Sequence, residues 1–235
     1  MKGSIYLIPS LIGENDTKSS ITPRLVEVIN TINTYIVENE RSARRFLKIA
    51  GIEKPIDSLK FFVLNNETPP GEISRYLDPI ENGTDAGIIS EAGCPGIADP
   101  GAEVVKLAHQ KGIKVIPLVG ASSIFMALMA SGMNGQNFAF TGYLPIKKPD
   151  RVMALKTLEK RSIQENQTQI FMETPYRNNQ LLADILTVCK PNTHLCIACD
   201  ITLESEFIKN QTIKQWKNDI PDIDKRPAIF LLHSN

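Results

Sequence analysis

The chain lacks any hydrophobic run as long as the roughly 20 apolar residues of a membrane-spanning helix. Its opening apolar stretch, residues 5–9, is too short for the core of a signal peptide and has no small-residue cleavage pattern. An excess of one charge is also absent, because 26 Lys and Arg residues balance 26 Asp and Glu residues. We therefore expect a cytoplasmic protein, away from membranes, that does not coat nucleic acid. A local basic patch around one RNA site stays open.

Cysteine and histidine are scarce, with four and three residues among 235. Cys196 and Cys199 have the spacing of half a zinc site or of a redox pair, but no second such pair occurs. Both fall in a predicted strand, where positions i and i+3 point to opposite faces. Buried core thiols are therefore the favoured interpretation. Nothing marks His109, His194 or His233 as catalytic, and we predict no metal site.

Phosphate-binding fingerprints are missing as well. The sequence contains neither the G-x-G-x-x-G spacing of dinucleotide-binding folds nor a Walker sequence. It also has no cluster of carboxylates suited to a metal ion that would assist phosphate chemistry. A nucleotide-phosphate hydrolase is therefore disfavoured.

The segments that are present alternate between strand-like and helix-like patterns. In the first half we predict strands at residues 5–9, 34–37, 61–64, 86–90 and 113–117, and helices at 23–31, 41–50, 71–80 and 100–111. In the second half we predict strands at 138–143, 169–173, 194–200, 205–208 and 228–233, and helices at 122–131, 151–163, 176–189 and 213–218. Alternation of this kind is typical of βαβ units, and the crowding of strands late in the chain indicates a mixed sheet. We predict two α/β domains, residues 1–118 and 119–235, with a mostly parallel N-terminal sheet and a cleft between the domains.

The densest signal is residues 88–101, where a buried strand runs into a loop of small residues and then a helix. Three glycines and two prolines in this span favour a ligand-binding loop over a plain turn. Asp99 is predicted to cap the following helix, and Gly112 to end it.

Ordered motifs in this chain resemble those of a known family. Residues 90–101, S-E-A-G-C-P-G-I-A-D-P-G, resemble the S-D-A-G-T-P-G-I-S-D-P-G signature of the ribosomal RNA small subunit methyltransferase I family, within the tetrapyrrole methylase superfamily. Further similar stretches are I-P-S-L-I-G at 8–13, I-P-L-V-G-A-S-S at 116–123, F-T-G-Y-L-P at 140–145 and E-T-P-Y-R at 173–177. Matches in the same order over residues 5–180 are more specific than any single motif.

The resemblance implies a homodimer that binds S-adenosylmethionine, a cofactor without phosphate, in the cleft between the two domains. The implied cofactor-binding residues are Pro9, Glu91, Ala92, Gly93, Cys94, Gly120, Ala121, Ser122, Gly142, Tyr143 and Leu144. Gly13 is implied to border the acceptor. Two basic groups are candidates for RNA binding: Arg41, Arg44 and Arg45 with Lys48, and Lys147 and Lys148 with Arg151. A solvated helix face is the alternative for the first group.

The chain departs from the family pattern on the side expected to face the acceptor. Residues 37–41 read V-E-N-E-R instead of A-E-D-T-R, residues 64–67 lack the H-E-H-N pattern, and Ser10-Leu11 replaces Thr-Pro. No general base is evident. The leading hypothesis is a methyltransferase acting on a ribose in small-subunit ribosomal RNA. A tetrapyrrole or other acceptor, and a non-catalytic cofactor-binding module, stay open as alternatives.

Overall fold

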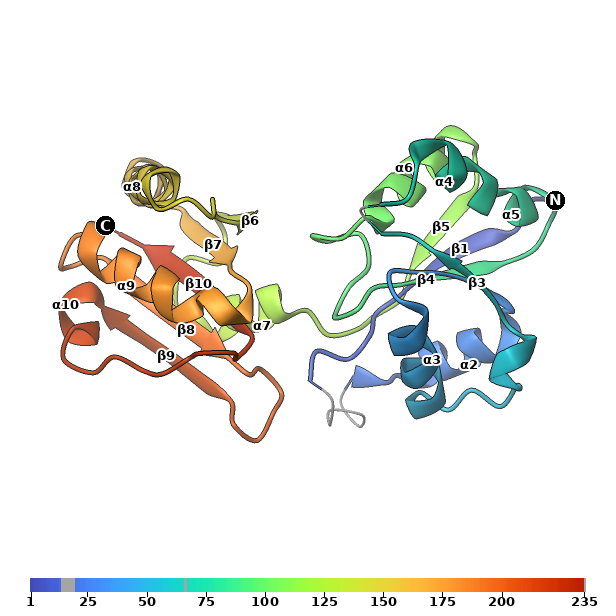
Figure 1. The fold of residues 1–235 in the computed structure, drawn as a ribbon, viewed down its shortest axis with the longest axis horizontal. Coiled ribbons are helices and arrows are strands. Elements are labelled where there is room, and N and C mark those ends of the chain that lie inside the picture. The colour runs from blue at the N-terminus through green and yellow to red at the C-terminus, as the bar shows by residue number, and fades with distance from the viewer. Residues whose placement is uncertain (14–19, 66, 235) are drawn as a thin grey trace. The chain divides into compact units, whose positions relative to one another are not determined.

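A computed structural model describes residues 1–13, 20–65 and 67–234 of the chain (Figure 1). The chain divides into two compact units, Met1–Ser122 and Ser123–Asn235. No helix in the described part of the chain is long and apolar enough to cross a membrane.

The first unit is built on a five-stranded sheet in the order β3-β2-β4-β1-β5, and every neighbouring pair of strands is parallel. Its strands are β1 (Ser4–Ile8), β2 (Thr34–Val37), β3 (Lys60–Val63), β4 (Ala86–Ile89) and β5 (Lys114–Pro117). Its helices are α2 (Pro23–Thr31), α3 (Glu40–Ile49), the 3-10 helix η1 (Ile56–Ser58), α4 (Pro70–Tyr76), α5 (Asp78–Glu81) and α6 (Gly101–Gln110). The predicted parallel sheet is confirmed.

Side-chain alternation along the strands builds two hydrophobic layers, one on each face of this sheet. Tyr35 and Val37 of β2 pack with α2 and α3 on one face. Ile36, between them, packs with α4, α5 and α6 on the other. This is the period of two that a strand buried on both faces requires. Because all five strands are parallel, their carboxyl ends and the loops that follow lie at one edge of the sheet.

Two details of this unit differ from the sequence-based expectation. The helix expected at 71–80 is two short helices, because Pro79 has no N–H with which to continue the first one. Asp99 is not the N-cap of α6, since that position belongs to Pro100. The Asp99 carboxylate instead accepts from the backbone N–H of Gly96 at 2.8 Å and of Gly101 at 2.6 Å, so it fastens the loop before the helix.

The second unit contains a mixed sheet in the order β6-β7-β10-β8-β9, in which only β6 and β7 run parallel among the pairs of neighbours. Its strands are β6 (Phe138–Tyr143), β7 (Thr168–Met172), β8 (His194–Cys199), β9 (Phe207–Thr212) and β10 (Ala228–His233). Its helices are α7 (Ser123–Ser131), α8 (Lys148–Glu165), the 3-10 helix η2 (Pro175–Arg177), α9 (Asn178–Val188) and α10 (Ile213–Trp216). The predicted mixed sheet is confirmed.

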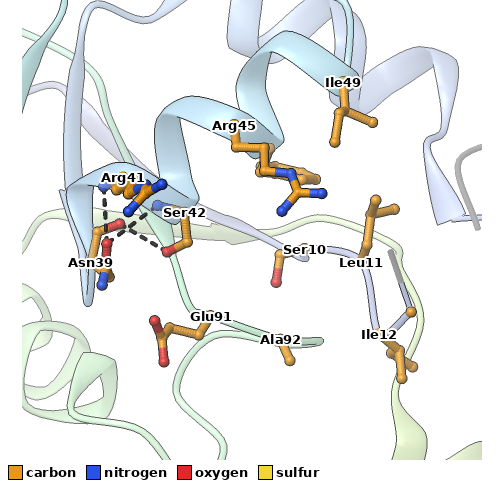
Figure 2. A pocket seen from close by; sticks show the side chains of 12 residues that line it. Ser10, Leu11, Ile12, Asn39, Arg41, Ser42, Arg45, Ile49, Glu91 and Ala92 are labelled. Atoms are coloured by element: carbon orange, nitrogen blue, oxygen red, sulfur yellow. Dashed lines mark hydrogen bonds between the residues drawn. The ribbon is translucent and has the colours of Figure 1, made fainter. Parts of the chain in front are cut away.

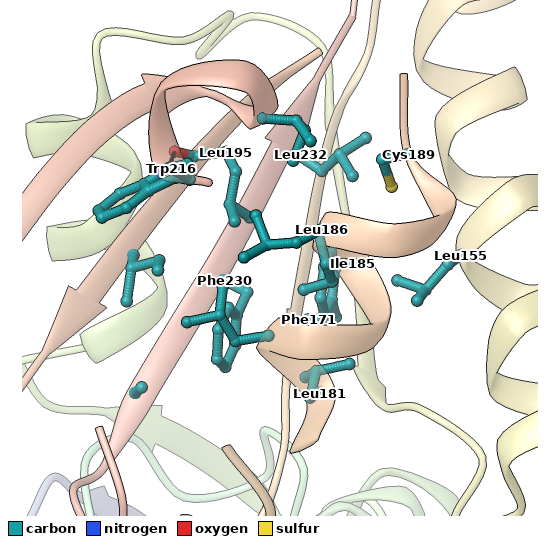
Figure 3. Packing of buried hydrophobic residues seen from close by; sticks show 14 of the residues in the cluster. Leu155, Phe171, Leu181, Ile185, Leu186, Cys189, Leu195, Trp216, Phe230 and Leu232 are labelled. Atoms are coloured by element: carbon teal, nitrogen blue, oxygen red, sulfur yellow. Dashed lines mark hydrogen bonds between the residues drawn. The ribbon is translucent and has the colours of Figure 1, made fainter. Parts of the chain in front are cut away.

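The main core of the second unit lies between the sheet and the helices α8, α9 and α10, as Figure 3 shows around Phe171, Phe230 and Trp216. Cys199 points into this core, whereas Cys196 packs on the opposite face of the sheet. Burial raises the pKa of the Cys196 thiol to about 12 and that of Cys199 to about 11. The prediction that these two cysteines are core thiols on opposite faces is confirmed.

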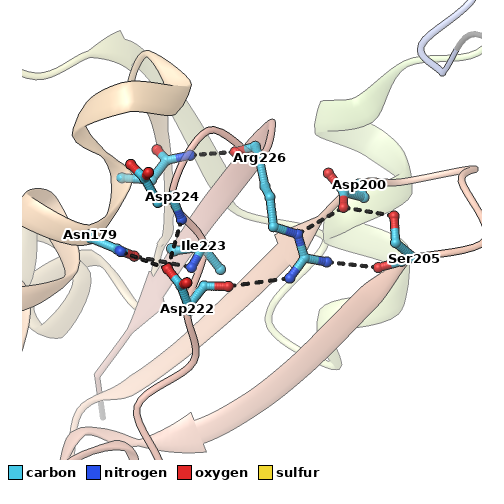
Figure 4. Close-up of polar contacts among 8 residues, drawn as sticks. Asn179, Asp200, Ser205, Asp222, Ile223, Asp224 and Arg226 are labelled. Atoms are coloured by element: carbon cyan, nitrogen blue, oxygen red, sulfur yellow. Dashed lines mark hydrogen bonds and ion pairs between the residues drawn. The ribbon is translucent and has the colours of Figure 1, made fainter.

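A polar cluster fixes the turn between β8 and β9 to the segment that enters β10 (Figure 4). The Arg226 guanidinium donates to Asp200 Oδ2 and to the carbonyl oxygen of Ser205, both at 2.8 Å. The Ser205 hydroxyl donates to the same carboxylate oxygen at 2.8 Å. These bonds hold the edge of the sheet where the sequence has no regular hydrophobic pattern.

Candidate functional site

Three loops at the carboxyl edge of the first unit's sheet contact one another. After β1, the backbone N–H of Ser10 donates to the carbonyl oxygen of Gly93, in the loop after β4, at 2.9 Å. The Cys94 thiol lies 3.4 Å from the carbonyl oxygen of Ala121, in the segment after β5. Of the predicted cofactor residues, the structure therefore brings together Pro9, Gly93, Cys94, Gly120 and Ala121.

Two glycines are required by this arrangement for different reasons. Gly93 has a φ of +70°, in the left-handed region that side chains other than glycine rarely adopt. Gly120 packs directly on Pro9, because a Cβ added to Gly120 would lie 2.3 Å from the Cβ of Pro9. The loops after β1 and β5 can therefore approach this closely only with glycine at position 120.

Two acidic side chains, Glu38 and Asp99, hydrogen-bond to the loop after β4. The Glu38 carboxylate accepts from the backbone N–H of Glu91 at 3.1 Å, and the Asp99 carboxylate holds the far end of the loop. Burial raises the pKa of Glu38, and the neighbouring Asp99 and Glu91 raise it further against the opposing effect of the Glu91 N–H. Carboxylates placed in this way suit a ligand with positive charge and disfavour a phosphate.

A pocket of about 450 Å³ opens beside this loop. It is lined by Ser10, Leu11, Ile12, Gly13, Asn39, Arg41, Ser42, Arg45, Phe46, Ile49, Glu91 and Ala92. Figure 2 shows α3 contributing Arg41, Ser42, Arg45 and Ile49 from one side. The pocket is within the usual range for small-molecule sites. Its lining includes three residues predicted to bind the methyl acceptor, Gly13, Arg41 and Arg45. It also includes two residues predicted to bind the cofactor, Glu91 and Ala92.

Arg44, the remaining predicted acceptor residue on α3, is held by its own neighbours. Its guanidinium donates to Glu40 and to Asp57, each at 2.8 Å, and lies over the ring of Phe61 at 5.0 Å from the centroid. With Arg41, Arg45 and Lys48 it lines a second, adjacent hollow. The one-faced basic group predicted on this helix is therefore present, but Arg44 also ties α3 to the η1 segment.

The second predicted basic group lies in the other unit, and only two of its three residues are exposed. Lys147 and Lys148 are exposed at the start of α8, as predicted. Arg151 is only 1% exposed, and its guanidinium makes two hydrogen bonds, of 2.8 and 2.6 Å, to the Asp184 carboxylate of α9. The assignment of Arg151 to RNA binding is wrong, because a buried guanidinium is needed here as the partner of a buried carboxylate.

The three predicted cofactor residues of the second unit lie at the end of β6: Gly142 and Tyr143 are its last two residues, and Leu144 follows it. Gly142 has a φ of +70°, and the strand register shifts between Phe140 and Tyr143. The Tyr143 side chain is 56% exposed, whereas Leu144 is buried in the core of its own unit. Leu144 can therefore offer a ligand only its backbone.

Two residues at positions where the chain departs from the family pattern, and to which no role was assigned, also line the pocket. Asn39, where the family has Asp, is the N-cap of α3: its side-chain oxygen accepts from the N–H groups of Arg41 and Ser42. Ser10 is 4% exposed, and its hydroxyl has no hydrogen-bond partner among the residues that the structure describes. The replacement of Thr-Pro by Ser10-Leu11 in the loop after β1 was the available signal. In the altered stretch 64–67, residue 66 lies outside the described residues.

Known proteins resemble this chain over almost its whole length, although no family model matches it. The ribosomal RNA small subunit methyltransferase I of Vibrio cholerae is 30% identical over 232 residues, which cover 97% of this chain and 76% of that protein. The protein of the same name from Buchnera aphidicola subsp. Schizaphis graminum is 32% identical over 233 residues, which cover 98% of this chain and 78% of that protein. The chain belongs to the ribosomal RNA small subunit methyltransferase I family.

Solved structures show the same fold at lower sequence identity. The methyltransferase CobJ is 15% identical and superimposes with a TM-score of 0.66, covering 99% of this chain and 94% of its own. The uroporphyrin III C-methyltransferase of Thermus thermophilus is 16% identical with a TM-score of 0.56, covering 99% and 98%. The predicted tetrapyrrole methylase-like fold is confirmed. As a member of its family, the chain is an S-adenosylmethionine-dependent methyltransferase.

The residues present fit this cofactor. S-adenosylmethionine has a positive sulfonium and no phosphate, in agreement with the acidic surroundings of the Gly93 loop. Main-chain N–H and C=O groups of this loop can approach a ligand closely because Gly93 carries no side chain. When bound, the cofactor supplies a methyl group that is already activated. The protein must then position the acceptor and exclude water.

Proposed function

We propose that this methyltransferase modifies a ribose 2′-hydroxyl in small-subunit ribosomal RNA. One observation carries the proposal: two sites of opposite electrostatic character adjoin on the first unit. Backbone N–H groups at the two ends of the loop around Gly93 donate hydrogen bonds to the Glu38 and Asp99 carboxylates, and the pocket beside it carries Arg41 and Arg45. A cationic methyl donor and an anionic RNA strand need this pair of surroundings. The names of the curated relatives support small-subunit ribosomal RNA as the substrate and favour it over a tetrapyrrole.

The proposed contacts follow from this division. The methyl donor is held by Pro9, by residues 91–94 and 120–122, and by Gly142, Tyr143 and Leu144. The acceptor strand is bound by Gly13, Arg41, Arg44 and Arg45, with Lys147 and Lys148 as further phosphate contacts. The carboxylates at the Gly93 loop orient the methyl donor, the arginines neutralise phosphates, and the apolar side chains around Leu11 and Ile49 keep bulk water away from the methyl group.

We further propose that the protein acts as a homodimer in the cytoplasm, the compartment of its proposed substrate. The support is α7, S-I-F-M-A-L-M-A-S, which is apolar around its whole circumference. Its inner side packs on the sheet through Ala127 and Leu128, while Phe125 is 50% and Met129 is 83% exposed. Exposed apolar side chains on one helix are typical of a protein interface.

The test is methyl transfer from labelled S-adenosylmethionine to small-subunit RNA from cells that lack the native enzyme. We expect label in the RNA, at a ribose that becomes resistant to alkaline cleavage. Calorimetry with S-adenosylmethionine runs in parallel. Cofactor binding without transfer to RNA or to a tetrapyrrole would leave only a binding module. Transfer to a tetrapyrrole alone would contradict the proposed acceptor.

The cofactor site is tested by Gly93→Asn, with Gly112→Asn as the matched control. Both glycines have positive φ, +70° and +62°, and asparagine tolerates this conformation better than most residues. Gly112 follows α6, and a Cβ there meets nothing within 4 Å. We expect Gly93→Asn to abolish measurable cofactor binding by placing a side chain in the site. Equal affinity in the two variants would contradict the assignment.

A further inference from the structure

Ser10 places a polar atom where the protein itself does not satisfy it. The residue is 4% exposed, and its hydroxyl oxygen has no hydrogen-bond partner within the described part of the chain. Yet the side chain belongs to the lining of the pocket. Figure 2 shows it between Arg45 on one side and the Glu91–Ala92 segment on the other. A buried hydroxyl without a partner destabilises the folded protein, so its retention at this position points to a ligand.

The backbone of Ser10 is fixed to the proposed donor site. Its N–H donates to the carbonyl oxygen of Gly93 at 2.9 Å, and its neighbour Pro9 packs on Gly120. The hydroxyl is therefore held at the junction of the loop proposed for the methyl donor and the pocket proposed for the acceptor. An acceptor atom that reacts must lie at this junction.

The pocket walls indicate what else the ligand carries. Arg41 and Arg45 of α3 provide positive charge on one side. Among the residues that the structure describes, Arg41 makes no ion pair. Leu11, Ile12 and Ile49 provide an apolar wall. A ligand with an anionic group, a flat apolar face and a neutral hydroxyl matches these three surfaces, and a nucleotide of a single strand has all three.

We infer that Ser10 positions the ribose that receives the methyl group. The inference rests on the proposed function and adds a residue and a site to it. One unpaired nucleotide occupies the pocket, with its phosphate at Arg41 and Arg45 and its base on the apolar wall. The Ser10 hydroxyl makes a hydrogen bond with the 2′-hydroxyl of the ribose. During methyl transfer, the bond from sulfur to the methyl carbon breaks and the bond from that carbon to the ribose 2′-oxygen forms. The proton of the ribose 2′-hydroxyl leaves to water. Ser10 holds the oxygen in line and takes no proton.

The first experiment compares Ser10→Ala and Ser10→Thr with the wild type. Ser10→Ala removes the hydroxyl, and we expect kcat to fall about tenfold with unchanged affinity for S-adenosylmethionine. Its melting temperature should not fall, because the group removed has no partner in the protein. Ser10→Thr keeps a hydroxyl and should restore most of the activity. Full activity in Ser10→Ala, or a fall in melting temperature that accompanies the loss, would overturn the inference.

The second experiment measures binding without catalysis. The probes are the four nucleoside 3′,5′-bisphosphates and their 2′-deoxy forms, observed by saturation-transfer NMR on the full chain. We expect at least one ribonucleotide to bind, and binding to weaken about tenfold in Ser10→Ala and in Arg41→Gln. Arg24→Gln is the control, since Arg24 lies on α2 in an exposed pair with Glu27. Loss of the 2′-hydroxyl should weaken binding to the wild type but not to Ser10→Ala.

The two experiments separate the inference from the proposed function. If the wild type transfers no methyl group to RNA, the proposed function fails, and the binding measurement alone decides the role of Ser10. If it transfers the group but Ser10→Ala transfers it equally well, the function stands and the inference is overturned. Absence of binding by all four ribonucleotides overturns the inference in either case.

Discussion

At the carboxyl edge of the first unit's sheet, close packing restricts which residue can stand at a given position. Gly120 lies against Pro9, whereas Gly71, at the start of α4, has nothing within 4 Å of an added Cβ. Only the contact between the loops after β1 and β5 makes one of them irreplaceable.

We predict that Gly120→Ala lowers the free energy of unfolding by about 1–3 kcal/mol, because the added carbon overlaps Pro9 and forces the two loops apart. The affinity for S-adenosylmethionine should fall as well. Gly71→Ala should leave both unchanged within about 0.5 kcal/mol. Urea unfolding and calorimetry on both variants are the measurements. Similar behaviour of the two would show that the loops are not packed as described.

Glu173 in the E-T-P-Y-R motif is a buried carboxylate with a specific partner. Burial opposes its ionisation, but the ion pair with Arg177 at 2.6 Å and the Thr174 N–H at 2.7 Å outweigh burial, so its pKa is lowered from 4.5. A carboxyl group whose pKa is lower in the folded state than in the unfolded state stabilises the protein at pH values above the unfolded pKa. This stabilisation is lost as the pH falls through the folded value.

We therefore predict that Glu173→Gln costs about 1–3 kcal/mol of unfolding free energy at pH 7. The difference from the wild type should shrink as the pH drops below 4.5, the ordinary value for this group. Urea unfolding at a series of pH values measures it. Glu165→Gln, in an exposed pair with Arg161, is the control and should stay within about 0.5 kcal/mol. A pH-independent difference would mean that the ion pair is not its source.

Among the secondary-structure elements, α3 shows how a departure from the family pattern can be neutral for the fold. Asn39 caps this helix through the N–H groups of Arg41 and Ser42. Asp, the family's residue here, caps helices about equally well. We predict that Asn39→Ala costs about 1 kcal/mol, whereas Asn39→Asp costs nothing measurable. Thermal unfolding decides between them. Destabilisation by Asp as large as by Ala would remove capping as the role of this position.

The helices α8 and α9 are joined by the buried pair of Arg151 and Asp184. We predict that Asp184→Asn destabilises the chain by about 3–5 kcal/mol, since a buried guanidinium is left without its countercharge. Lys148 lies 3.6 Å from the same carboxylate but is 71% exposed, so Lys148→Gln should cost less than about 1 kcal/mol. Chemical unfolding of both variants separates the two. Equal losses would mean that the pair with Arg151 is not the dominant contact of Asp184.

At the scale of the whole molecule, the exposed apolar side of α7 bears on assembly. Phe125 and Met129 project from a helix whose other side packs on the sheet through Ala127 and Leu128. We predict that Met129→Glu, an exposed position, yields a folded monomer where the wild type is a dimer. Light scattering after gel filtration measures the mass, and circular dichroism checks the fold. A monomeric wild type would remove the proposed dimer.

Much of the fold could be predicted from the sequence because most of its strands are short apolar runs separated by turns and helices. β2, β6, β10 and α2 begin and end at the predicted residues. β9 was the weakest prediction. Its residues 209–212 are polar, and only antiparallel pairing with β8 identifies them as a strand. Pairing between distant segments leaves little trace in local composition.

The site could be predicted in part. Ordered motifs indicated the loops after β1, β4 and β5, and parallel strands bring those loops to one edge. The fate of individual charges could not be predicted in this way. Lys147, Lys148 and Arg151 are basic residues that lie close together in the sequence. Arg151 nevertheless has a structural role, because it is buried and paired with Asp184. The buried state of the Ser10 hydroxyl likewise depends on contacts that no local pattern records.

The hydrogen bond from the Glu91 backbone to Glu38 has a thermodynamic consequence. Glu38 immediately precedes Asn39 and α3, so one bond connects the helix that carries Arg41 to the loop around Gly93. A ligand that orders either segment lowers the entropic cost of ordering the other. If binding at one site orders its segment, occupancy of that site favours occupancy of the other, by the same factor in both directions. The methyl donor and the acceptor RNA would thus raise each other's affinity without any large movement of the chain.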